Sequence, residues 1–102
     1  MTEGPPTNSE SVEVSKNDVV ESLKLDPEDL SLLHKFLDKR EVEVQDSREA
    51  LALNVEVAEI YRDAGLLEAA KEAFIQAAQQ AWQEQDDTLH EQLLAEADKI
   101  QF

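Results

Sequence analysis

The amino-acid sequence predicts an all-α fold of four helices, arranged as a small bundle or array, behind a disordered N-terminal tail. Ala, Leu, Glu, Gln and Lys dominate after the first 17 residues, and all five favour helices. Beyond residue 6 the chain has one Pro and one Gly, Pro27 and Gly65, and each stands where a helix is expected to begin or end. Apolar residues recur at intervals of three and four, which places them on one face of a helix. With 102 residues we expect one domain.

Residues 1–17 are expected to form a flexible, acidic and polar tail, and residues 18–102 to form the helical domain. The tail contains Pro5 and Pro6 and several Ser, Thr and Asn residues, with few large apolar side chains that could support a core. Val12 and Val14 alternate with Glu13, which leaves open that the tail adds to a partner as an edge strand.

The first helix is expected at about residues 27–39. Asp26 is a typical N-cap, and Pro27 suits the first helical position. A short turn containing Val19, Val20 and Leu23 is expected ahead of it. Residues 41–45 are expected to form a connector whose Val42 and Val44 pack onto the helices.

Three longer helices are expected at about residues 47–64, 66–84 and 88–100. Apolar residues occupy two adjacent sides of residues 47–64, so this helix should lie between neighbours or present one side to a ligand. Gly65 is a typical residue for ending a helix. The helix at 66–84 is rich in Ala, which lets helix axes approach closely, and Trp82 is expected to anchor the end of the core. Thr88 and Glu91 have the spacing of a capping box for the last helix.

Residues 54–77 combine small and aromatic residues in a recognisable order. Tyr61 lies near the end of one helix, Gly65 lies at the corner, and Ala70, Phe74 and Ala77 follow on one side of the next helix. This pattern resembles a tetratricopeptide repeat, a helical hairpin in which small residues let the helices touch and aromatic residues fill the space between them.

The resemblance is to a single, degenerate repeat. Val57 and Ala58 stand for the family's Leu-Gly pair, Asn54 replaces its Trp, and Trp82 replaces its closing Pro. An unrelated helical bundle therefore remains the alternative.

The resemblance implies that the first helix of the hairpin lines a concave, ligand-binding side. The expected contact residues are Leu51, Ala52, Val55, Glu59, Arg62 and Asp63. Because this set mixes apolar and acidic residues, the expected partner is a protein or peptide with a basic or amphipathic helical segment. If Leu51 and Val55 are exposed, they could also pair two copies as a homodimer.

The net charge of −15 disfavours nucleic acid and anionic membranes as partners. No Lys or Arg lies between Lys71 and Lys99, although seven acidic residues do, so this half of the domain should be a strongly negative surface. The main expectation is a non-catalytic adaptor or scaffold, and the alternative is an acidic inhibitor or sequestering protein that covers a partner's basic surface. The lack of a signal-like or membrane-spanning stretch favours a cytoplasmic location.

Neither a catalytic site nor a cofactor site is expected. The absence of Cys excludes thiol chemistry and cysteine-ligated metals, and two Gly residues cannot build a phosphate-binding loop. His34 is expected to be an ordinary helix residue, since no small residue follows one turn later as in phosphotransfer domains. His90 lies near Asp86, Asp87 and Glu91, but helix capping accounts for these acidic residues without a metal.

Overall fold

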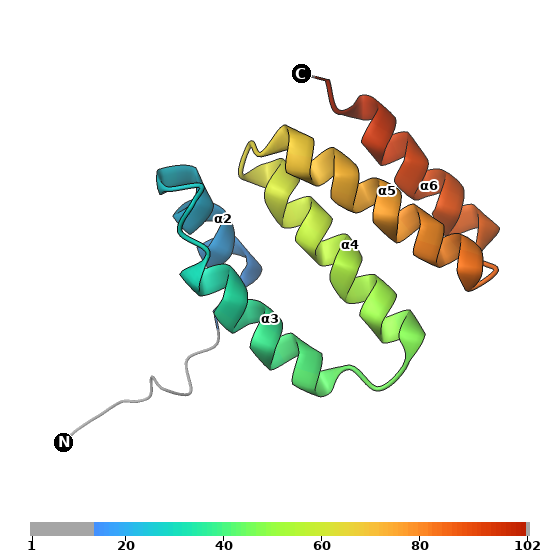
Figure 1. Cartoon of the computed structure of the whole chain (residues 1–102), viewed down its shortest axis with the longest axis horizontal. Coiled ribbons are helices and arrows are strands. Elements are labelled where there is room, and N and C mark those ends of the chain that lie inside the picture. The colour runs from blue at the N-terminus through green and yellow to red at the C-terminus, as the bar shows by residue number, and fades with distance from the viewer. Residues whose placement is uncertain (1–13, 102) are drawn as a thin grey trace.

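The computed structural model describes residues 14–101, and these residues form five α-helices (Figure 1). The helices are α2 (Lys16–Leu25), α3 (Ser31–Glu43), α4 (Ser47–Asp63), α5 (Leu67–Gln83) and α6 (Asp87–Lys99). The prediction of an all-α fold is confirmed, whereas the count of four helices is wrong for the described part of the chain. The edge-strand hypothesis for Val12 and Glu13, like most of the predicted tail, lies outside the described residues.

The additional helix is α2, where a short turn was expected. Ser15 and Asp18 form a capping box, in which the Ser15 side chain accepts from the Asp18 backbone and the Asp18 side chain accepts from the Ser15 backbone. Val19, Val20 and Leu23 are buried on one face of α2. The cap and this apolar face together start the helix at Lys16, so the helical domain begins before residue 18.

The predicted helix at residues 27–39 lies instead at Ser31–Glu43. Asp26 ends α2 rather than starting α3, and its carboxylate accepts from the backbone N–H of Glu28 at 3.1 Å, which holds the intervening turn. Asp29 then accepts from the Ser31 backbone at 3.1 Å and from the Ser31 hydroxyl at 2.6 Å at the start of α3. These hydrogen bonds hold the turn between the two helices, and Pro27 disfavours a helical backbone at Asp26, which is extended at φ −150° and ψ 98°.

The predicted connector at residues 41–45 is largely helical, because α3 continues to Glu43. Val44 packs against the core, as expected. Val42 does not, since 85% of it is exposed on the outer side of the last turn of α3.

The three longer helices begin and end within one residue of their predicted bounds. Asp86, one of the residues expected to cap the last helix, caps α6, because its carboxylate accepts from the Leu89 backbone at 3.1 Å, whereas Thr88 lies within the first turn. The turns after α4 and α5 are equivalent Schellman motifs, with a left-handed residue in each: Gly65 at φ 84° and Gln85 at φ 63°. In the first turn, the N–H of Gly65 donates to the Arg62 carbonyl at 3.0 Å and the N–H of Leu66 to the Tyr61 carbonyl at 2.9 Å. In the second turn, the N–H of Gln85 donates to the Trp82 carbonyl at 3.0 Å and the N–H of Asp86 to the Ala81 carbonyl at 2.9 Å.

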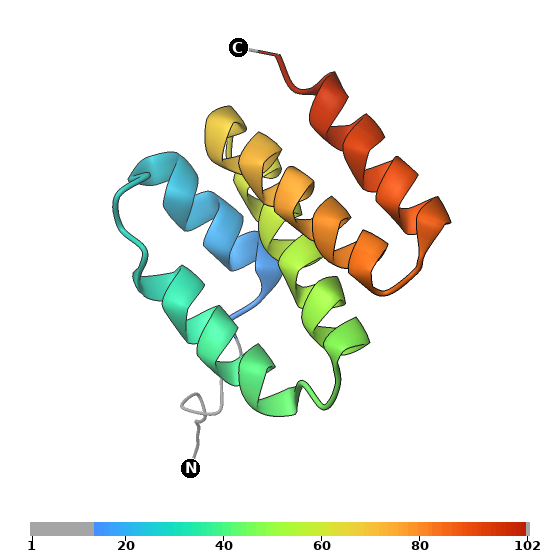
Figure 2. The same cartoon turned by 45° about the vertical axis from the view of Figure 1, so that its right-hand side comes forward.

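Helix α4 lies between two groups of helices, with α2 and α3 on one side and α5 and α6 on the other (Figures 1 and 2). Two clusters of buried residues fill the two sides. One contains Val19, Leu23, Leu33, Phe36, Leu53 and Ile60, and the other contains Leu51, Ala58, Phe74, Ala78, Ala81, Leu93 and Ala97. The two apolar sides expected for α4 are therefore both buried against neighbours.

Trp82 is not part of this core, contrary to expectation, and 62% of it is exposed. The buried side of α5 is formed by Ala70, Phe74, Ala77, Ala78 and Ala81. Trp82 is the next residue after Ala81, so the helical rotation of about 100° turns it away from this side. No helix in residues 14–101 is both long and apolar enough to cross a membrane.

Candidate functional site

The residues predicted to contact a partner lie on α4 and differ in exposure. Leu51 is 3% exposed and packs in the core, so it is unavailable to a partner. Ala52 and Asp63 are exposed, whereas Val55, Glu59 and Arg62 are half-buried. We call the remaining set of Ala52, Val55, Glu59, Arg62 and Asp63 the α4 face; its members recur at helical spacing on one side of the helix.

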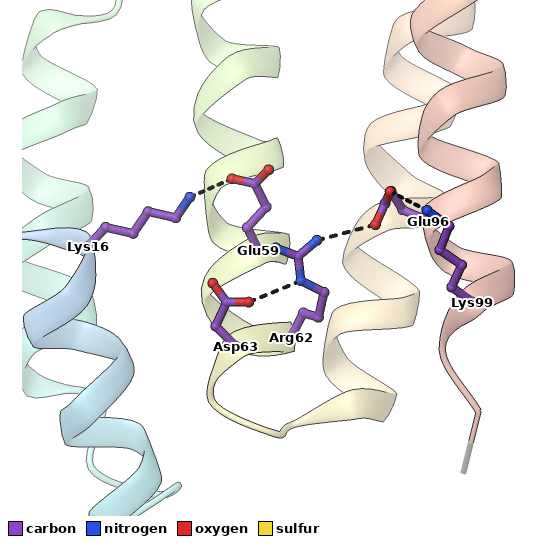
Figure 3. A network of polar contacts seen from close by, with 6 residues as sticks. All are labelled: Lys16, Glu59, Arg62, Asp63, Glu96 and Lys99. Carbon is purple, nitrogen blue, oxygen red and sulfur yellow. Dashed lines mark hydrogen bonds and ion pairs between the residues drawn. The ribbon is translucent and has the colours of Figure 1, made fainter.

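Glu59 and Arg62 of the α4 face form ion pairs with neighbouring helices (Figure 3). The Lys16 ammonium of α2 donates to the Glu59 carboxylate at 2.5 Å. On the other side, the Arg62 guanidinium reaches the Glu96 carboxylate of α6 at 3.2 Å, and Lys99 contacts the same carboxylate at 3.1 Å. Ion pairs therefore join α2 to α4 and α4 to α6 along one side of the three helices.

Arg62 is the centre of this network. Its Nε donates to Asp63 at 3.1 Å, and its guanidinium carbon lies 5.8 Å from the centre of the Phe74 ring. Partial burial lowers the pKa of Arg62, but the hydrogen bond that Arg62 donates to Asp63 and the charges of Asp63, Glu59 and Glu96 outweigh that effect and raise the pKa above its ordinary value. Arg62 therefore stays charged and orients the carboxylates around it.

The structure does not meet the condition for the predicted homodimer, which was that Leu51 and Val55 are both exposed. Leu51 lies in the core, and Val55 is half-buried against the same cluster. These two residues therefore do not form the exposed apolar pair on which that prediction rests, because Leu51 is buried in the cluster that α4 forms with α5 and α6.

A second surface, which the sequence analysis missed, lies on the outer side of α5 and α6. Trp82, Gln79 and Gln83 of α5 and His90 of α6 line an open depression of about 460 Å³. We call these four residues the Trp82 surface. Apolar spacing alone did not reveal this surface, because Trp82 lies four residues after Ala78 and therefore fits the apolar stripe expected for this helix.

The two histidines have ordinary structural roles in the described part of the chain. His34 is exposed on α3. Nδ1 of His90 lies 2.8 Å from the Ala78 carbonyl and donates its proton to it, because a carbonyl oxygen only accepts. The His90 ring also packs on Trp82, with centroids 5.4 Å apart. Among residues 14–101, no group of three or more His, Asp or Glu side chains is placed to hold a metal ion.

Comparisons with known protein families, with curated proteins and with solved structures each returned no match. The geometry of the chain therefore defines the class of protein. Residues 14–101 form an all-α unit in which one central helix is buried on two sides and carries a polar network on a third.

Proposed function

We propose that this protein is a non-catalytic protein–protein interaction module of tetratricopeptide-like type, acting as a small adaptor or scaffold. The observation that carries the proposal is that the alternate helices α2, α4 and α6 share one side and are joined there by the Lys16–Glu59 and Arg62–Glu96 ion pairs. In the tetratricopeptide family that the sequence resembles, alternate helices line the ligand-binding side.

The ion pairs hold the α4 face in a defined position for a partner. Side chains that are already ordered lose little conformational entropy when a ligand binds, so a pre-organised surface binds more tightly than a flexible one. Exposed Ala52 offers a place for close approach, and the surrounding charges of Glu59, Arg62 and Asp63 suit a polar or amphipathic segment.

In the experiment, the unchanged protein and two single variants are immobilised, and their binding of a partner is compared. Ala52→Arg places a long side chain on the α4 face, and Ala95→Arg places the same side chain on an exposed position of α6 as the matched control. A partner captured by the unchanged protein is identified, purified and measured by calorimetry. We expect Ala52→Arg to weaken its binding about tenfold or more and Ala95→Arg to leave it within about twofold. Equal binding by all three proteins would contradict the role of the α4 face.

A second candidate function is that of an acidic inhibitor that covers a basic surface. It is favoured by the run of residues 72–98, which holds seven acidic residues and no Lys or Arg. The salt dependence of binding separates the candidates, because attraction between exposed charges is screened by salt. Affinity that falls steeply from low to high salt favours the inhibitor, whereas salt-insensitive binding that Ala52→Arg abolishes favours the α4 face.

A further inference from the structure

We propose that the Trp82 surface docks a basic segment of a partner protein and holds one of its Lys or Arg side chains against the Trp82 ring. The inference rests on the proposed function as an interaction module, and it names a second contact surface and the chemistry of its partner. Three features carry it: the exposure and fixed position of Trp82, the carboxylates around it, and the charge of the rest of the chain.

Trp82 is exposed but held in place. It is 62% exposed at the end of α5, while the His90 ring packs on it at a centroid distance of 5.4 Å and an interplanar angle of 53°. His90 is itself fixed by its 2.8 Å hydrogen bond to the Ala78 carbonyl. A large aromatic side chain that is both exposed and oriented is typical of the residues that dominate binding energy at protein interfaces.

The surroundings of Trp82 favour a cation. Asp87 lines a second open depression of about 570 Å³ together with Trp82, and Glu91 lies one turn further along the same face of α6. No ion pair joins Asp87 or Glu91 to a Lys or Arg within residues 14–101, whereas Asp86 and Glu96 are paired with Arg48 and Arg62. The face of a Trp ring attracts Lys and Arg, and nearby carboxylates add to that attraction.

Exposed apolar residues extend this surface along both helices. Ile75 lies two turns before Trp82 on α5, and Leu94 lies one turn after His90 on α6; they are 36% and 37% exposed. Helices α5 and α6 run side by side (Figure 2), so an extended or helical segment can contact the apolar residues and Trp82 together. We therefore expect a partner segment that carries both apolar and basic side chains.

Charge identifies the occupant as a different protein. Residues 1–13 contain three Glu and no Lys or Arg, so the chain's own N-terminal segment is not complementary to this surface. A second copy carries the same net charge of −15, which opposes self-association. A basic segment of another protein meets no such repulsion and gains from the carboxylates of Asp87 and Glu91.

The test uses a helical peptide built only of Leu and Lys, with a matched peptide of Leu and Glu as the control. Trp82 is the only Trp in the chain, so its fluorescence reports directly on this surface. We expect the Leu-Lys peptide to shift the emission of Trp82 and the Leu-Glu peptide to leave it unchanged. A shift with both peptides, or with neither, overturns the inference.

Variants then locate the binding by calorimetry. Trp82→Ala should weaken binding of the Leu-Lys peptide about tenfold or more. Trp82→Leu, which keeps an apolar side chain but loses the aromatic ring, should weaken it about two- to fivefold. Because Trp82 is exposed, both variants should keep the helical circular dichroism signal, and if Trp82→Ala does not fold, Trp82→Leu decides. Unchanged affinity in the folded variants contradicts the proposal.

A charge-matched pair of variants separates a local site from general attraction. Asp87→Asn removes a carboxylate beside Trp82, and Asp98→Asn removes one at the opposite end of α6. We expect Asp87→Asn to weaken binding about two- to fivefold and Asp98→Asn by clearly less. Equal weakening by the two variants would show that peptide binding depends only on the net charge of the protein, which would overturn the inference. A natural partner that binds the Trp82→Ala variant normally but no longer binds the Ala52→Arg variant would overturn this inference and leave the proposed function standing.

Discussion

The two equivalent turns after α4 and α5 provide a reciprocal test of the structure. Both contain a left-handed residue with the same pair of hydrogen bonds, yet one residue is Gly65 and the other is Gln85. Gly adopts this backbone conformation without steric cost, whereas other residues do not. We therefore expect Gly65→Gln to destabilise the protein and Gln85→Gly to stabilise it.

The magnitude follows from the backbone alone. A left-handed conformation costs a residue with a Cβ about 1–2 kcal/mol. Removing Gly also restricts the unfolded chain, which returns about 0.4–1 kcal/mol. A Cβ added at Gly65 would meet no atom within 4 Å, so no steric clash adds to the cost. The net expectation is a loss of about 1 kcal/mol in the free energy of unfolding for Gly65→Gln and a similar gain for Gln85→Gly.

The assay is urea unfolding followed by far-ultraviolet circular dichroism. A change of about 1 kcal/mol corresponds to a midpoint shift of about 0.5–1 M urea and a Tm shift of about 4–8 °C for a domain of this size. The double variant should return close to the original midpoint, since the two turns lie at opposite ends of α5. Gly65→Asn, which tolerates the left-handed region better, should lose less than Gly65→Gln. A destabilised Gln85→Gly variant would refute the reasoning, because it would show that the Gln85 side chain matters more than its backbone.

Three further predictions concern the core, an exposed valine and a titrating carboxylate. Phe74 is 1% exposed, so Phe74→Ala should lower the free energy of unfolding by about 3–5 kcal/mol in the same urea assay. Val42→Ala should change it by less than about 0.5 kcal/mol, because Val42 is 85% exposed, and a larger loss would mean that Val42 packs on the core after all. Hydrogen bonds from the Ser31 side chain and backbone lower the pKa of Asp29, so nuclear magnetic resonance should find that pKa below the ordinary Asp value and raised in Ser31→Ala. Because the folded-state pKa is the lower one, the stabilisation is present above the ordinary Asp pKa and is lost as the pH falls through the folded-state pKa.

Much of the helical architecture was predictable because helix boundaries depend on nearby residues. Gly65 ends α4 as expected, and the spacing of apolar residues correctly placed α4, α5 and α6. The same local reasoning failed at Asp26, whose side chain can cap a following helix or hold a turn. Packing decided between the two, since Val19, Val20 and Leu23 form a buried face that keeps α2 helical up to Leu25.

The candidate site was less predictable because exposure depends on distant segments. The sequence placed Leu51 and Ala52 next to each other on a helix with two apolar sides, and it could not tell which of them another helix covers. The structure buries Leu51 and leaves Ala52 exposed. The partners of Glu59 and Arg62 were equally inaccessible to sequence reasoning, since Lys16 and Glu96 lie 43 and 34 residues away along the chain.

The all-α class, the strong negative charge and the positions of the three longer helices follow from the amino-acid sequence. These properties depend on composition and on interactions between residues a few positions apart. The burial of α4 on two sides, the ion pairs that join α2 to α4 and α4 to α6, and the outward position of Trp82 emerge when the helices pack. Burial and ion pairing between helices depend on that packing, which local preferences do not specify.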